Sequence, residues 1–258
     1  SRVRLGSLVV CNDLRSPALV AKMAASLDVL SSGRMEIGLG AGWFEAEYEA
    51  AGVAFDAAGV RVGRLAEAVQ IVTGMLSNEK FSFEGKHYRV KGAANLPQPV
   101  QKPRPPIFVG GKGDRVCRIA GRFADGFNTV WAWLPDAYAD RVRLVNEAAE
   151  SSGRDPASIK KTIGLYCLPA DSVSDLESRW KLYKEATPGV GPETFDEWRP
   201  DKLAGTADQI LDRLREFAAI GAEEVILGFG LLPFQIADAD AVGWFAREII
   251  PQAKDLRG

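Results

Sequence analysis

The sequence has 258 residues, which is enough for one large domain or two small ones and, in either case, for a sizeable hydrophobic core. Apolar residues make up 47% and charged residues 26%, values that are typical of a soluble globular protein and exclude a disordered chain. The net charge of -2 provides no excess for binding nucleic acid or an anionic membrane surface. A small-molecule partner is therefore the default expectation.

The cysteines and the apolar runs argue against several further classes. Cys11, Cys117 and Cys167 lie far apart without a Cys-x-x-Cys pair, and His87 is the only histidine, so neither a zinc site nor a disulfide framework is expected. The apolar runs are too short to cross a bilayer, and residues 1–10 have the pattern of a strand rather than of a signal peptide. We expect a cytoplasmic protein without a bound metal.

Strand-like and helix-like patterns alternate from the start of the chain. Ser16 and Pro17 supply an N-cap and a first-turn proline for the first helix. The apolar positions expected along that helix are Leu19, Val20, Met23, Leu27 and Leu30. The other elements expected in this part are strands over 3–10 and 35–39, helices over 45–51 and 61–76, and a hairpin over 81–90.

The same alternation continues to the C-terminus. Strands are expected over 107–109, 127–130, 162–168 and 224–227, and helices over 116–123, 136–150, 207–220 and 242–250. Thr206 and Gln209 form a capping box that opens the third of these helices. Residues 171–202 hold a second capping box, from Ser174 to Glu177, and several prolines and glycines, and we interpret them as an insertion. Six strand-then-helix units result.

This alternation indicates a parallel sheet covered by helices. The pattern alone is compatible both with a closed (β/α) barrel and with an open doubly wound sheet. In both architectures the loops after the strands carry the chemistry, because backbone amides and helix N-termini converge there. The loops to search are residues 11–12, 40–43, 110–113, 129–133 and 228–230.

Two of these loops are rich in glycine. Residues 38–42 lack the third glycine of the dinucleotide-binding fingerprint, because Trp43 stands there, so these glycines either permit a tight turn or let a flat ring approach the backbone. Residues 110–113 lie between a strand and a helix that begins near Asp114. Their backbone amides, the helix dipole and Lys112 could face an anion. A phosphate site and a plain turn are the two interpretations.

Aromatic residues also follow the strands. Rings at these positions could line a pocket for a planar cofactor or an apolar substrate, or pack in the core. They are Trp43, Trp131, Trp133 and Phe229. The chain has no Gly-x-Ser-x-Gly, His-Glu-x-x-His or paired-cysteine motif. It therefore fits a protein whose cofactor does the chemistry, and no catalytic side chain is assigned.

Several segments together match one known family. They include LGSLV at 5–9, RSPA at 15–18, SGRMEIGLGAGW at 32–43, FEGKHY at 83–88 and ADGFN at 124–128, with further matches at 105–111, 205–206 and 249–251. In these segments the chain resembles the luciferase-like monooxygenase superfamily, specifically its branch of F420-dependent oxidoreductases. The resemblance covers nearly the whole chain, and the motifs are specific in combination.

The resemblance implies a (β/α)8 TIM barrel of the bacterial luciferase-like type, as one domain over residues 1–258 with the insertion at about 171–202, often dimeric. A flavin or 5-deazaflavin would lie at the C-terminal mouth. A bulge that often contains a non-proline cis peptide would back the ring, and it corresponds here to Val9, Val10, Cys11 and Asn12. Ala41 and Gly42 would touch the ring or its side chain. The phosphate would be held by Gly110, Gly111, Lys112 and Gly113.

The chain also departs from that family. Counted against it, the sequence begins at the third strand, so two strand-helix units are absent, as in a piece of a longer chain or an incomplete barrel. The missing second strand commonly ends in an active-site histidine or acidic residue, and nothing here replaces it. The sugar-phosphate dehydrogenase branch has a glutamate where this chain has Trp43, which favours an apolar or aromatic substrate instead.

Three functional hypotheses follow from the resemblance. The first is an oxidoreductase that uses coenzyme F420 and passes hydride between the deazaflavin and an organic substrate. The second is an FMN-dependent monooxygenase that uses molecular oxygen. The third is a non-catalytic paralogue or fragment that retains only cofactor binding. The expected partners are a small-molecule substrate and a second copy of the chain, without nucleic acid or membrane.

Overall fold

The computed structural model describes residues 2–254 and residue 256. The chain divides into two compact units, which are described separately. The first contains the residues up to Phe127 together with Leu144–Ile159, and the second contains Asn128–Arg143 and the residues from Lys160 onward. Strand β7 (Gly126–Trp131) and helix α5 (Pro135–Glu150) contribute to both units. A single barrel domain over the whole chain stays a prediction.

The first unit is built on a parallel sheet. Strand β3 (Met35–Gly40) pairs with β1 (Leu5–Gly6) and β2 (Val10–Cys11), and also with β6 (Ile107–Gly110). The single strand predicted over 3–10 is therefore wrong, since it is two short strands. The break lies at Ser7, whose hydroxyl bonds both the N–H and the carbonyl of Gly38 and so replaces the backbone pairing there.

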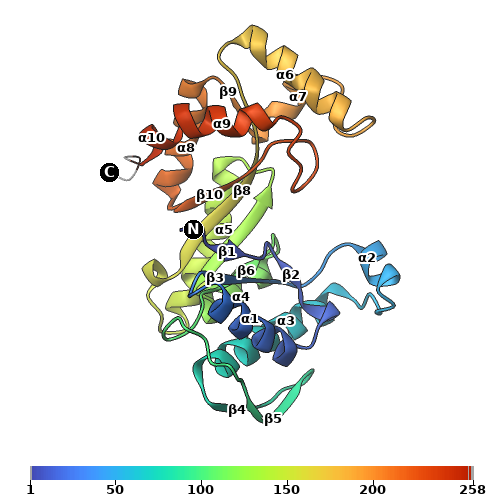
Figure 1. Ribbon diagram of the computed structural model, residues 1–258, viewed down its shortest axis with the longest axis vertical. Coiled ribbons are helices and arrows are strands. Elements are labelled where there is room, and N and C mark those ends of the chain that lie inside the picture. The colour runs from blue at the N-terminus through green and yellow to red at the C-terminus, as the bar shows by residue number, and fades with distance from the viewer. Residues whose placement is uncertain (1, 255, 257–258) are drawn as a thin grey trace. The chain divides into compact units, whose positions relative to one another are not determined.

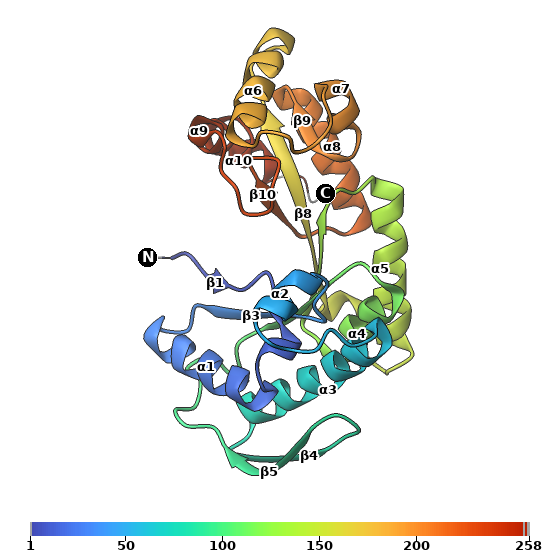
Figure 2. The same ribbon diagram turned by 90° about the vertical axis from the view of Figure 1, so that its right-hand side faces the viewer.

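Helices cover this sheet as predicted. Helices α1 (Pro17–Leu30) and α3 (Ala58–Ser77) pack side by side, α2 (Glu45–Ala50) follows β3, and α4 (Asp114–Phe123) follows β6 (Figure 1). The predicted hairpin is confirmed as the antiparallel pair β4 (Lys80–Glu84) and β5 (Arg89–Ala94), which lies against α3 (Figure 2).

The buried face of α1 differs from the predicted one. Small residues form most of it, and its members are Pro17, Val20, Ala21, Ala24, Ala25 and Asp28. Of the predicted apolar positions only Val20 is buried, whereas Leu19, Met23, Leu27 and Leu30 are exposed. Alanine side chains let α1 approach α3 and β3 closely, so the helix turns its small residues inward and leaves the larger ones at the surface.

The second unit contains a further parallel sheet segment. Strand β8 (Lys160–Pro169) pairs in parallel with β10 (Glu224–Gly228) and with the short β9 (Leu203–Gly205), which the sequence did not predict. Helix α8 (Ala207–Ile220) begins at the predicted capping box of Thr206 and Gln209, which is confirmed. Helices α9 (Ala239–Glu248) and α10 (Ile250–Ala253) follow β10.

Residues 171–202 form helical structure between β8 and β9. Helix α6 (Val173–Ala186) is followed by the short α7 (Phe195–Trp198) and has its own apolar cluster. The predicted capping box from Ser174 to Glu177 is wrong. Ser172 is the N-cap, because it is the last residue with extended backbone and its hydroxyl accepts the N–H of Asp175. A capping box is formed instead by Thr194 and Glu197 at the start of α7.

Three glycines of the first unit leave room for Val9. A Cβ atom built on Gly38 would lie 2.8 Å from Val9 Cγ1 and would collide with the carbonyl oxygen of Ser7. The Cβ atoms of Gly40 and Gly110 would lie 2.5 and 2.7 Å from the methyl groups of Val9. These strands therefore lack side chains at the positions that the Val9 side chain occupies.

We predict that Gly38→Ala lowers the free energy of unfolding by about 2 kcal/mol, because the new methyl group meets rigid backbone. Urea unfolding measures the change. The control is Gly59→Ala in the first turn of α3. A Cβ atom there would lie 3.4 Å from Arg115 Nη1, the end of a flexible side chain, and alanine favours the helix, so stability should be unchanged or raised. Equal losses in both variants would contradict the packing role of Gly38.

Candidate functional site

The carboxyl ends of three strands meet in the first unit. Cys11 at the end of β2 is in register with Gly40 at the end of β3, and Gly40 is in register with Gly110 at the end of β6. The structure thus brings together the predicted segments 9–12, 41–42 and 110–113. The peptide bond between Leu8 and Val9 is cis, where the family resemblance implies a non-proline cis peptide.

The hydroxyl of Tyr48, a fully buried residue of α2, connects two of these segments. It accepts a hydrogen bond from Cys11 Sγ at 3.2 Å. Its single proton can be donated either to the carbonyl of Ala41 at 3.1 Å or to Asp13 Oδ2 at 3.4 Å. The same hydroxyl occupies the space above Gly42, which has a φ of 74°. Tyr48 therefore fixes the turn after β3 against the end of β2.

A partly buried ion pair lies beside this hydroxyl. The side chain of Asp13 is 1% exposed, and its Oδ2 accepts from Arg64 Nη1 of α3 at 3.1 Å. Arg64 also pairs with Asp56, and this hydrogen bond is the main reason that the pKa of Arg64 is raised. Asn12 donates from its amide to Asp13 Oδ1 and to the hydroxyl of Tyr88, both within 3.2 Å. The segment after β2 is therefore held from α3 and from the β-hairpin.

Burial raises the pKa values of the two tyrosines in this network. For Tyr48, desolvation is the largest cause, and the hydrogen bond with Cys11 adds to it. For Tyr88, desolvation outweighs the opposing hydrogen bond from Asn12. Both phenols therefore stay protonated at neutral pH and can act as donors.

The turn after β6 ends at the N-terminus of a helix. Gly113 is the N-cap of α4, with extended backbone at φ -76° and ψ 146°, and a Cβ atom built there would have no neighbour within 4 Å. The carbonyl of Gly113 accepts the N–H groups of Val116 and Cys117. Gly113 adds no side chain of its own to this helix N-terminus, and Lys112 before it is exposed, an arrangement that suits an anion.

The predicted aromatic residues fall in different places. Trp43, in the first unit, is 80% exposed. In the second unit the half-buried Trp131 stacks on Tyr166 of β8, with ring centroids 5.2 Å apart. The backbone N–H of Trp133 donates to the carbonyl of Asp201. Phe229 is buried against a ring of α9, so the structure places it in core packing.

Sequence reasoning missed several residues of this network. Asp13 directly follows the predicted Cys11-Asn12 segment, and this position was the only signal for it. Tyr48, Arg64 and Tyr88 come from two helices and a hairpin without a local motif, and only the tertiary fold shows their contacts. Within the described residues, no cluster of three His, Cys, Asp or Glu side chains could hold a metal ion. None of the helices described is long and apolar enough for a membrane span.

Comparisons with known proteins identify relatives over most of the chain. The family model for luciferase-like monooxygenases matches residues 1–226. The chain is 37% identical over 212 residues to the F420-dependent glucose-6-phosphate dehydrogenase of Kineococcus radiotolerans, an alignment that covers 81% of this chain and 57% of the relative. It is 26% identical over 271 residues to the FMNH(2)-dependent dimethylsulfone monooxygenase of Pseudomonas putida, covering 93% and 72% of the two chains.

Solved structures share the fold. An F420-dependent secondary alcohol dehydrogenase in complex with an F420-acetone adduct matches with a TM-score of 0.77 at 19% identity, over 100% of this chain and 80% of that one. The coenzyme F420-dependent tetrahydromethanopterin reductase of Methanopyrus kandleri matches with a TM-score of 0.77 at 21% identity, over 98% and 84%. The fold is therefore the α/β fold of luciferase-like TIM-barrel proteins. The sequence pattern alone was also compatible with an open doubly wound sheet.

We predict that Arg64→Met lowers the free energy of unfolding by about 2 to 3 kcal/mol, because it leaves the Asp13 carboxylate buried without its cation. Adding Asp13→Asn to that variant should restore about half of the loss, as measured by urea unfolding. Arg89→Met is the control, since Arg89 and Glu84 form an exposed pair and no measurable change is expected. A double variant no more stable than Arg64→Met would contradict the pairing.

The raised pKa values of the tyrosines imply that stability falls at alkaline pH. Desolvation by burial is the largest cause of a raised pKa for all five, which are Tyr48, Tyr88, Tyr138, Tyr166 and Tyr183. The folded chain holds these protons more tightly than the unfolded chain, so this stabilisation is complete below pH about 10 and is lost as the pH rises further. Ultraviolet titration at pH 10 should show about half of the phenols ionised in urea and far fewer in the folded chain. Equal fractions would contradict the prediction.

Proposed function

Because the chain belongs to the luciferase-like monooxygenase family, we propose that it is an oxidoreductase that binds coenzyme F420 and transfers hydride between the deazaflavin and an organic substrate. The observation that carries the proposal is the meeting of the β2, β3 and β6 ends beside the open N-terminus of α4. The relatives support the proposal as well, because the 37% identical enzyme and both structural neighbours described above are F420-dependent.

The residues of the turn after β6 fit the phosphate of such a cofactor. Gly113 leaves the end of α4 open, and Lys112 is exposed beside it. Helix N-termini of this kind favour phosphate through their amide groups and dipole. Gly110, Gly111, Lys112 and Gly113 would hold the phosphate in this proposal. When bound, the deazaflavin supplies a ring carbon that accepts or gives the hydride.

The remaining residues of the site orient the ring. Val9, Val10, Cys11 and Asn12 would back it, and Ala41 and Gly42 would touch it. Tyr48 holds both segments through Cys11 Sγ and the Ala41 carbonyl, and Arg64 neutralises the buried Asp13 next to them. A rigid backing surface reduces the conformational freedom that must be lost in reaching the reactive geometry.

An apolar or aromatic substrate is part of the proposal. The residues that would line its pocket are Trp131 and Trp133 of the second unit, since Trp43 belongs to the first unit and Phe229 packs in the core. The half-buried ring of Trp131 supports this choice. The 37% identical relative is a glucose-6-phosphate dehydrogenase, and a sugar phosphate is a polar substrate. Assays with apolar substrates and with sugar phosphates therefore test this preference.

An FMN-dependent monooxygenase is the second candidate. The relative from Pseudomonas putida is FMNH(2)-dependent, and its alignment covers 93% of this chain. FMN also carries a phosphate, so the turn after β6 suits both cofactors. The two functions differ in their oxygen requirement, because a deazaflavin with carbon in place of N5 does not readily react with oxygen.

A homodimer in the cytoplasm completes the proposal. The exposed apolar stripe of Leu19, Met23, Leu27 and Leu30 on α1 supports self-association, because exposed apolar patches of this kind mark interaction surfaces.

Fluorescence titrations of the chain with F420 and, separately, with FMN test the proposal. We expect tighter binding of F420. We also expect Gly113→Asp to weaken that binding at least about tenfold relative to Gly113→Asn. Both substitutions supply a helix cap at an extended position, but only aspartate places a negative charge where the phosphate would lie.

Each alternative result has a definite meaning. Preference for FMN would support the monooxygenase. Equal binding by the Gly113→Asp and Gly113→Asn variants would contradict the phosphate assignment. Binding of neither cofactor by the unsubstituted chain would contradict the proposed function.

A further inference from the structure

The loop after β10 presents an exposed aromatic ring. Phe234 is 71% exposed and has a φ of 63°, a left-handed conformation that is rare for a bulky residue. Leu232 and Ile236 of the same loop are 43% and 63% exposed. A residue keeps such a backbone conformation only where its surroundings fix it, and fixed conformations of this kind cluster at functional sites.

One anchor of this loop is Gln235. Its Oε1 accepts the N–H groups of Leu231 and Leu232, and its Nε2 donates to Thr187 Oγ1 at 2.8 Å. Thr187 follows the last residue of α6. The loop is thus bonded to the segment that the sequence identified as an insertion.

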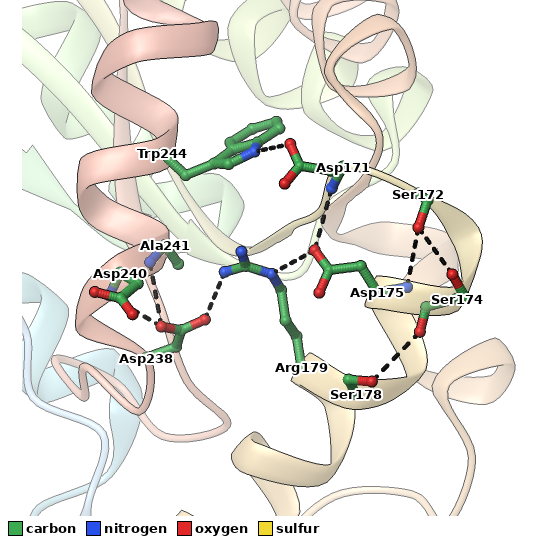
Figure 3. Close-up of polar contacts among 10 residues, drawn as sticks. All are labelled: Asp171, Ser172, Ser174, Asp175, Ser178, Arg179, Asp238, Asp240, Ala241 and Trp244. Carbon is green, nitrogen blue, oxygen red and sulfur yellow. Dashed lines mark hydrogen bonds and ion pairs between the residues drawn. The ribbon is translucent and has the colours of Figure 1, made fainter.

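The other anchor is an ion pair at the end of the loop (Figure 3). Arg179 of α6 donates to Asp175 at 2.9 Å and to Asp238 at 2.7 Å, and Asp238 caps α9 by accepting two of its first-turn N–H groups. Trp244 of α9 adds a bond to Asp171 just before α6. Gln235 and Asp238 of the loop are therefore bonded to the residue directly after α6 and to α6 itself.

Phe234 packs against Trp131, one of a stacked pair of aromatic side chains. Its ring and that of Trp131 pack in an edge-to-face geometry at 86°, with centroids 5.6 Å apart. Trp131 in turn stacks on Tyr166 at an interplanar angle of 25°. Gly228, at the end of β10, has no side chain to displace these rings, since a Cβ there would lie 3.3 Å from both. Three aromatic rings from three segments are thus gathered at one place in the second unit.

We propose that Phe234, Trp131 and Tyr166 form a recognition surface for a flat aromatic ring of the substrate, and that Phe234 determines this specificity. The inference rests on the proposed oxidoreductase function and deepens it, because it names the substrate class and the role of the insertion. The insertion holds the loop on which Phe234 stands.

The arrangement favours a flat ring over a saturated one. Aromatic rings attract each other in stacked and edge-to-face geometries, beyond the effect of the area that they bury. The Phe234 ring, at nearly a right angle to Trp131 of the stacked pair, offers both geometries to a fourth ring. A saturated ring system of the same carbon skeleton is thicker and gains neither interaction.

Equilibrium binding of 2-naphthol and of its saturated counterpart, trans-2-decalol, to the full chain tests the proposal without any cofactor. We expect the chain to bind 2-naphthol about fivefold to tenfold more tightly than trans-2-decalol. Phe234→Ala should remove most of this preference, and Phe234→Trp should retain it. Leu232→Ala is the matched control, because Leu232 is an exposed apolar residue of the same loop, and the preference should be unchanged.

Other outcomes overturn the proposal. No preference in the unsubstituted chain, or an equal loss in the Phe234→Ala and Leu232→Ala variants, shows that the rings do not select a flat ligand. A Phe234→Ala variant that keeps the preference but sediments as a smaller species shows that the surface is an interface between copies of the chain.

Cofactor titration separates this inference from the proposed function. If F420 binds and the preference for 2-naphthol is absent, the inference alone fails. If the preference is present and neither F420 nor FMN binds, the proposed function fails, and with it the assignment of the ring as part of a substrate.

Discussion

The candidate cofactor site depends on the packing of the Val9 side chain against three glycines. Its methyl groups lie where side chains of Gly38, Gly40 and Gly110 would otherwise be, so one residue packs across the ends of β3 and β6. Cys11 and Asn12 follow directly and are tied to Tyr48 and Tyr88. Gly38, Gly40 and Gly110 thus make room for a side chain of the chain itself. The sequence had suggested other roles for such glycines, namely a tight turn or the approach of a flat ring.

The elements of regular structure could be predicted largely from the sequence. Hydrophobic periodicity and the proline and capping signals located α1, α3, α8 and the hairpin, because these features are local. Predictions from local patterns were wrong where a side chain contacts a distant segment of the chain. The Ser7 hydroxyl interrupts a strand that the pattern made continuous, and alanine packing turns the buried face of α1 away from its leucines.

The functional residues were less accessible to sequence reasoning. Glycine turns after strands pointed to 41–42 and 110–113, and strand register brings these segments together with the end of β2. Tyr48, Arg64 and Phe234 carry no motif, since their contacts reach distant segments of the chain. In the second unit, three separate segments likewise bring together the rings of Trp131, Tyr166 and Phe234.

We propose that the strand ends of the first unit bind the cofactor, with its phosphate at the start of α4. Hydrogen exchange of the full chain with and without F420 tests this claim most directly, because it reports protection at each backbone amide. We predict that F420 slows exchange in residues 9–13, 41–43 and 110–117. Protection confined to other segments, with these three unchanged at saturating F420, would contradict it.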